Sequence, residues 1–208
     1  YVISFNPIIK TISLVKDGQK IQFITTNDYL SDKLHHKIID QIIENKPKIQ
    51  HELWILGDED NRLEIALKAR QVDNKYIMED LSNIPKIFLA LPLEGTHDLS
   101  LPIIINSKTF VPVKERNGIV LSKSNTEDVS HNKHLIKEAL DLFVKLISSL
   151  PLDQWYDLHN LLVFSEPPKK DWLDDEWFKD ILNDIINKLM DVNLVKTING
   201  YFPPSNCQ

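Results

Sequence analysis

Glycine is scarce in this chain: five occur among 208 residues, and they are widely separated. A backbone that wraps around a phosphate needs clustered glycines, because only glycine lets the main chain approach a ligand closely. Neither a G-x-G-x-x-G turn nor a Walker loop can be written anywhere in this sequence. We therefore expect that the chain by itself binds no nucleotide cofactor.

The composition is that of a globular protein, with 42% hydrophobic and 26% charged residues. The length allows one large domain or two small ones. A net charge of −6 argues against direct nucleic-acid binding, which needs a basic face. The single cysteine, Cys207, excludes a disulfide framework and a thiolate zinc site.

No apolar run reaches the roughly 18 residues typical of a membrane span, so we expect no membrane association. The first residues, from Tyr1, lack the charged start and the small-residue cleavage site of a signal peptide. They also lack an initiator Met and have the character of a strand. We therefore expect a fragment, or a processed product, of a longer cytoplasmic protein.

The first third of the chain predicts two β-hairpins. Residues 8–15 and 20–23 flank Asp17-Gly18, a pair that favours a tight turn with positive φ. Residues 49–56 lead through a polar loop to residues 63–70, where apolar and charged residues alternate. This alternation is typical of an antiparallel sheet with one face in water.

Three further segments are apolar. The spacing of the apolar residues over 34–43 predicts a helix, which would place His35 and His36 on different sides. Residues 87–91 and 103–105 are continuously apolar, as expected of central strands that are covered on both sides. Residues 119–121 predict another short strand.

The sequence after residue 126 predicts helices. Ser130 is a candidate N-cap for a helix with an apolar stripe through Ile147, and Asp153 for a shorter helix through Leu162. Residues 177–190 give the clearest amphipathic pattern. Residues 194–198 predict a final strand.

Together these elements predict an α+β fold: a mixed, largely antiparallel β-sheet with helices packed on it, followed by a helical C-terminal part. We expect a β-rich domain over residues 1–126 and a helical subdomain over residues 127–208.

Two groups of residues could bind a metal ion. His131 and His134 lie one helical turn apart with Asp128 nearby, but no glutamate lies between the histidines as a zinc hydrolase requires. Residues 58–60 are acidic, but their loop is too short for an EF-hand. We interpret these as an exposed helical turn and a solvated hairpin tip, and we expect no metal site.

Trp155, Trp172 and Trp177 fall in the acidic helical part. They could dock a protein partner, which makes an interaction module the alternative function. An exposed apolar patch around the last two would favour it. Helix packing is the simpler interpretation of the three rings.

The segment 85–121 brings polar residues to the ends of buried strands. Asn106-Ser107 follow one strand, and Lys114-Glu115-Arg116 enter a turn. A lysine and an arginine at a strand exit can reach a phosphate held by another domain, although they can equally be a solvated turn.

This segment resembles the region that follows the ATPase domain in sacsin-like proteins, especially the large bacterial type. Those proteins belong to the GHKL superfamily, with gyrase B, MutL, histidine kinases and the heat-shock ninety chaperones. The matching residues are Phe88–Leu93, Leu101–Ser107, Phe110–Pro112, Glu115–Leu121 and Asn132-Lys133, with weaker similarity at Ser4–Pro7 and Leu194–Gly200.

The resemblance implies a middle, or transducer, region rather than an ATPase domain. The superfamily's metal-binding Asn helix and Asp-x-Gly-x-Gly loop are not in this sequence, so ATP and Mg²⁺ would belong to the parent protein. Related middle domains deliver a basic residue to the γ-phosphate of ATP bound next door. The resemblance implies Arg116 for that catalytic role and Lys114 second, with Asn106 and Ser107 shaping turns. The implied partner is the chain's own upstream ATPase domain, with a protein client or a second copy also possible.

Overall fold

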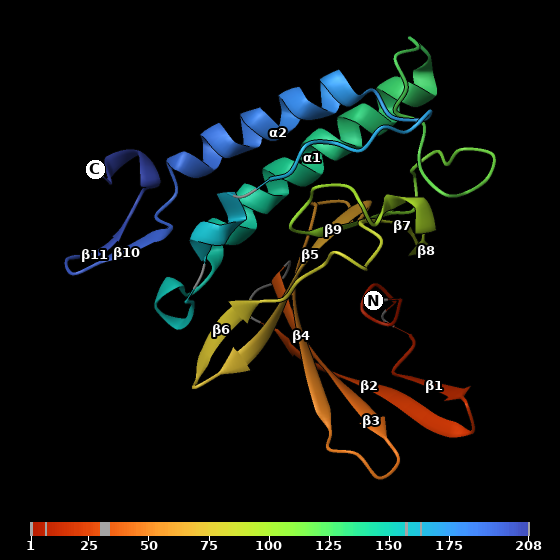
Figure 1. The fold of residues 1–208 in the computed structure, drawn as a ribbon, viewed down its shortest axis with the longest axis vertical. Coiled ribbons are helices and arrows are strands. Elements are labelled where there is room, and N and C mark those ends of the chain that lie inside the picture. The colour runs from red at the N-terminus through yellow and green to blue at the C-terminus, as the bar shows by residue number, and fades with distance from the viewer. Residues whose placement is uncertain (1, 7, 30–33, 157, 163, 208) are drawn as a thin grey trace.

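The computed structural model describes residues 2–6, 8–29, 34–156, 158–162 and 164–207. The fold is α+β, as predicted: a curled, mostly antiparallel sheet with two long helices on one of its faces (Figure 1). The strand order is β1-β2-β3-β4-β5-β9-β7-β8, with β6 paired to β5. Only the pairing of β7 with β9 is parallel within the described sheet.

The strands of this sheet are β1 Thr11–Lys16, β2 Gln19–Tyr29, β3 Leu34–Ile43, β4 Ile49–Gly57, β5 Leu63–Val72, β6 Lys75–Met78, β7 Ile87–Leu89, β8 Leu91–Pro92 and β9 Ile104–Ser107. The helices are α1 Glu127–Ser149 and α2 Asp175–Met190. The 3₁₀ turns are η1 Glu94–Thr96, η2 Leu152–Gln154, η3 Leu158–Leu162 and η4 Pro204–Asn206. A separate hairpin is made of β10 Val195–Thr197 and β11 Gly200–Phe202.

Both predicted hairpins are confirmed. β1 and β2 pair up to Lys16 and Gln19, and the turn residues Asp17 and Gly18 have φ of 50° and 76°. These are the positive values that a two-residue hairpin turn requires. β4 and β5 pair from Gly57 onward across the polar loop.

The predicted helix over 34–43 is wrong, because these residues form β3. β3 pairs with β2 on one side and with β4 on the other. Its isoleucines are β-branched and pack well in strands. Leu34 contributes to one hydrophobic cluster and Ile39 to the other, so apolar residues face both sides of the sheet and imitate a helical stripe.

The face of β4 and β5 that was expected to be in water is partly covered. Ile3 and Phe5 of the N-terminal segment pack there against Leu53, Ile55 and Ala66. The predicted inward residues of β5 are buried on the opposite face, beneath the helices. The central strands β7 and β9 have apolar contacts on both faces, as predicted.

The two long helices are confirmed with changed starts. Thr126, not Ser130, caps α1 by accepting a hydrogen bond from the Val129 amide. Asp174 caps α2 by accepting from the Trp177 amide. The shorter helix predicted after Asp153 is wrong: that region forms the 3₁₀ turns η2 and η3.

The predicted strand over residues 119–121 is wrong, because Ile119 and Leu121 make only isolated bridges to Pro112 and Leu173. The C-terminal strand is β10, which pairs with β11 in a hairpin.

One hydrophobic cluster joins the sheet to the helices. α1 contacts β4, β5 and α2, and its buried residues share the cluster with those of β5 and β9. The segment after η3 runs back beside α1 before α2 begins (Figure 1). The division into two domains at residue 126 stays a prediction.

Lys86 is a buried charge at the edge of this core, with 3% of its surface exposed. Its Nζ donates to the carbonyl oxygens of Leu81, Ile84 and His97 at 2.6, 2.9 and 2.8 Å. Burial lowers the pKa of Lys86 to about 8, whereas the negative charges of Asp80 and Asp98 act to raise it. The ammonium therefore links the segment before β7 to the segment that follows η1.

We expect Lys86→Met to lower the free energy of unfolding by about 2–4 kcal/mol, because three backbone carbonyls lose their charged donor. Urea denaturation measures this change. Lys137→Met, at an exposed lysine on α1, is the matched control and should change the stability by less than about 0.5 kcal/mol. Equal effects of the two substitutions would contradict a structural role for Lys86.

The same lysine predicts a pH dependence. Its pKa is about 8 in the folded chain and near the ordinary 10.5 when unfolded. Between these values the unfolded chain binds more protons, so the contribution of Lys86 to stability rises with pH. The stability difference between wild type and Lys86→Met should therefore grow from about pH 7.5 to about pH 9.5. A constant difference would contradict the lowered pKa.

Candidate functional site

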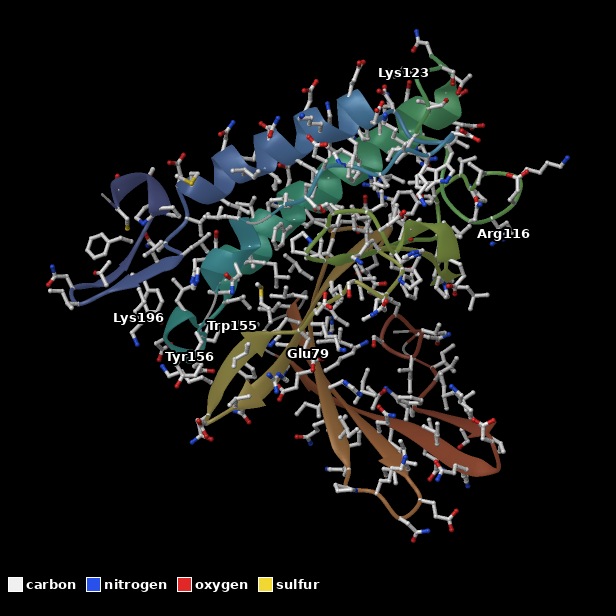
Figure 2. All side chains as sticks on the ribbon, in the orientation of Figure 1. Glu79, Arg116, Lys123, Trp155, Tyr156 and Lys196 are labelled. Atoms are coloured by element: carbon white, nitrogen blue, oxygen red, sulfur yellow. The ribbon has the colours of Figure 1, made fainter. Side chains whose placement is uncertain are left out.

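Residues 111–120, which we call the basic loop, form a narrow hairpin between β9 and α1. The Val120 amide donates to the Val111 carbonyl at 3.1 Å, and the Val113 amide donates to the Gly118 carbonyl at 3.0 Å. Arg116 lies at the margin of the molecule (Figure 2). The loop therefore has a paired stem and an outward-facing tip.

Asn132 of α1 holds both arms of this stem. Its Oδ1 accepts from the Val111 amide at 2.9 Å, and its Nδ2 donates to the carbonyls of Val111 and Val120 at 2.8 and 3.0 Å. The side chain is fully buried, with 0% of the residue exposed. A buried amide is tolerated when its hydrogen bonds are made, and this one makes three.

Two of the scarce glycines permit close packing at the base of the basic loop. A Cβ on Gly118 would lie 2.4 Å from the ring of Trp172, and a Cβ on Gly95 would lie 2.2 Å from the Asn117 carbonyl oxygen. The loop thus rests on Trp172 and on η1 at distances that only glycine allows.

The tip presents Lys114 and Arg116 to solvent. Both are exposed, and neither forms an ion pair within the part of the chain that the structure describes. Arg116 has φ of 53°, a left-handed conformation that costs a non-glycine residue about 1 kcal/mol or more. Such strain persists only where the surrounding structure enforces it.

Like Arg116, Ala90 has a positive φ without being Gly, Asn or Asp. Of the seven described non-glycine residues with positive φ, five are Asn or Asp, which tolerate it, and the other two are Ala90 and Arg116. The Ala90 amide donates to Asn106 Oδ1 at 3.1 Å, and Asn106 Nδ2 donates to Glu64 Oε2 at 2.9 Å. Ser107 Oγ accepts from the Thr109 amide at 3.2 Å. Asn106 and Ser107 therefore shape turns, as expected.

The two candidate metal groups do not assemble. His131 Nε2 lies 2.9 Å from the Thr109 carbonyl, and His134 lies beside Glu138, one turn along α1. Asp58 accepts from the backbone amides of Arg62 and Leu63. Among the described residues, no three His, Cys, Asp or Glu side chains are placed to hold a metal.

The tryptophans pack against the core. Trp155 is 2% exposed and lies 6.0 Å from Trp54, which stacks on His36. Trp172 covers Gly118, and Lys133 Nζ lies 4.8 Å from the centroid of Trp177. Both rings are half-buried and pack against the core cluster, and the docking module stays a prediction.

The sequence predicts the tip of the basic loop but not the side chain that supports it. The signal for Asn132 is its position on the apolar side of a helix, where an asparagine indicates a buried hydrogen bond. The contact of Gly95 with Asn117 has no local signal, because it joins segments distant in sequence.

Comparison with known proteins gave no match to a protein family, to a curated protein or to a solved structure. None of the helices in the described residues is long and apolar enough to cross a bilayer.

We expect Asn132→Ala to lower the free energy of unfolding by about 2–4 kcal/mol, because three backbone groups lose their partner. It should also loosen the basic loop, so that trypsin cleaves faster after Lys114 and Arg116. Urea denaturation and timed proteolysis measure the two effects. Asn125→Ala, at an exposed position before α1, is the control and should change neither. An unchanged rate of cleavage in Asn132→Ala would contradict the role of Asn132 in holding the basic loop.

Proposed function

We propose that this chain is the middle, transducer-like region of a larger sacsin-like ATPase of the GHKL type. The region does not hydrolyse ATP by itself. It completes an ATP site in a preceding domain and relays the closure of that site. The observation that carries the proposal is a strained arginine, Arg116, on a well-supported loop, with no ion-pair partner among the described residues.

The support around the basic loop fits this role. A cation stabilises a developing phosphoryl charge best when it is held in place before the reaction, because no reorganisation is then required. Asn132, Gly95 and Gly118 fix the loop, while Lys114 and Arg116 remain available at its tip. The two cations suit a phosphate group.

The position of the N-terminal segment suits a preceding domain that contacts the basic loop. Phe5 packs against Phe88 of β7, with ring centroids 5.7 Å apart. β7 leads through β8 to η1, where Gly95 contacts the basic loop. A domain joined ahead of this segment would enter near the elements that carry Arg116.

In the parent protein the preceding domain would hold ATP and Mg²⁺. Arg116 would contact the γ-phosphate and stabilise negative charge on its oxygens, with Lys114 in a secondary position. Delivery of the cation from a second domain makes hydrolysis depend on closure. Through Asn132 the loop is tied to α1, which packs on β4, β5 and α2, so that closure would move the helices together.

We expect Arg116→Ala to lower ATP turnover of the full-length parent about a hundredfold, because one transition-state contact is lost. Lys114→Ala should have a smaller effect, about tenfold. Steady-state ATP hydrolysis measures both, and circular dichroism verifies that the fold is intact.

Arg70→Ala is the matched control, since Arg70 is an exposed arginine on β5. Its turnover should equal that of the wild type. Unchanged turnover in Arg116→Ala would refute the role of Arg116. The sequence that precedes Tyr1 tests the parentage separately: it should encode a helix with a metal-binding Asn and a glycine-rich loop.

A further inference from the structure

A cavity of about 320 Å³ opens beside β3, β5 and β9, on the sheet face that carries the N-terminal segment. Three lysines line it: Lys10 before β1, Lys37 on β3 and Lys108 after β9. We call it the lysine cavity. Phe5 and Ile55 add an apolar wall. The lysine cavity shares no residue with the basic loop.

The three lysines outnumber the carboxylate that lines the cavity, Glu64. None of them forms an ion pair in the part of the chain that is described. Lys37 Nζ donates to the Ser4 carbonyl, which fixes its position. Burial lowers the pKa of Lys37, and the charge of Lys10 lowers it further, whereas Glu64 acts in the opposite sense. Gathered ammonium groups repel one another, and a bound anion would relieve that repulsion.

Glu64 is the carboxylate inside this cavity. Its Oε2 accepts from Asn106 Nδ2 at 2.9 Å, and Asn106 is only 3% exposed. Burial raises the pKa of Glu64, while Asn106, Lys37 and Lys108 oppose the rise. One carboxylate thus faces three lysines, and the buried amide beside it is fixed by the Ala90 amide.

The remaining charges at the rim are of both signs. Arg62 lies 3.4 Å from Asp58 and 3.3 Å from Asp60, so its positive charge is more than compensated and this group contributes one net negative charge. Burial lowers the pKa of His35, and the charge of Lys37 lowers it further, which disfavours a positive charge on its imidazole. The net positive charge in the cavity comes from the three lysines.

We propose that the lysine cavity binds the phosphate group of a small phosphorylated molecule. This site is independent of the parent ATPase proposed above. A phosphate carries nearly two charges and several acceptor oxygens, which three ammonium groups can share. The volume suits a small metabolite, and the wall of Phe5 and Ile55 suits an apolar or ring-shaped remainder.

The test is a calorimetric titration of this chain with pyrophosphate at low ionic strength, where surface electrostatics are least screened. We expect saturable binding. Lys37→Gln and Lys108→Gln should each weaken it about fivefold or more, because each removes one cation from the cavity. Glu64→Gln should strengthen it about fivefold, since it removes the opposing charge and retains an acceptor for Asn106.

Lys20→Gln, at an exposed lysine of β2, is the matched control and should leave the affinity unchanged. Nuclear magnetic resonance should show shifts of the Asn106 side-chain amide and the Ala90 backbone amide on titration. The Asn106 side chain lines the cavity, and the Ala90 amide donates to its Oδ1.

Several results would overturn the proposal. They are the absence of saturable binding, an equal loss of affinity in Lys20→Gln and Lys37→Gln, and no gain of affinity in Glu64→Gln. Binding lost in Arg116→Ala but kept in Lys37→Gln would assign the anion to the basic loop instead. Malonate bound as tightly as pyrophosphate would indicate a carboxylate site.

Discussion

The buried carboxamide of Asn132 is the interaction on which the architecture around the basic loop depends. Its three hydrogen bonds join α1 to both arms of the stem, and the helix in turn packs on β4 and β5. Burying an amide without partners costs free energy, so the helix and the loop are stable together and unfavourable apart. A loop of exposed charges acquires from this link the rigidity of the core.

The sequence predicts the fold well wherever one pattern has one explanation. Asp17-Gly18 indicated its turn, and the apolar stripe of residues 177–190 indicated α2. Residues 34–43 fit two patterns, because a strand covered on both faces can place its isoleucines at helical spacing. Their β-branched side chains favoured the strand, and pairing with β2 and β4 decided it.

One of the two candidate sites can be predicted from the sequence, and the other cannot. Lys114 and Arg116 were visible in the sequence because they follow a buried strand and share one turn. The lysine cavity was not, because Lys10, Lys37 and Lys108 come from separate segments and meet only when the sheet curls. Periodicity reports which face a residue occupies, but not which distant residues share that face. Convergent charge therefore has to be found in the folded chain.

The overall charge of the chain sharpens what the basic loop and the lysine cavity can bind. A net charge of −6 repels anions at long range, so neither site benefits from steering by the whole molecule. Binding at either proposed site would then come from short-range contacts with several cations. Such contacts favour a compact anion of high charge, since each ammonium or guanidinium group gains most from a doubly charged oxygen cluster. At either proposed site these contacts would therefore have to outweigh a long-range repulsion that is larger for phosphate than for a single carboxylate.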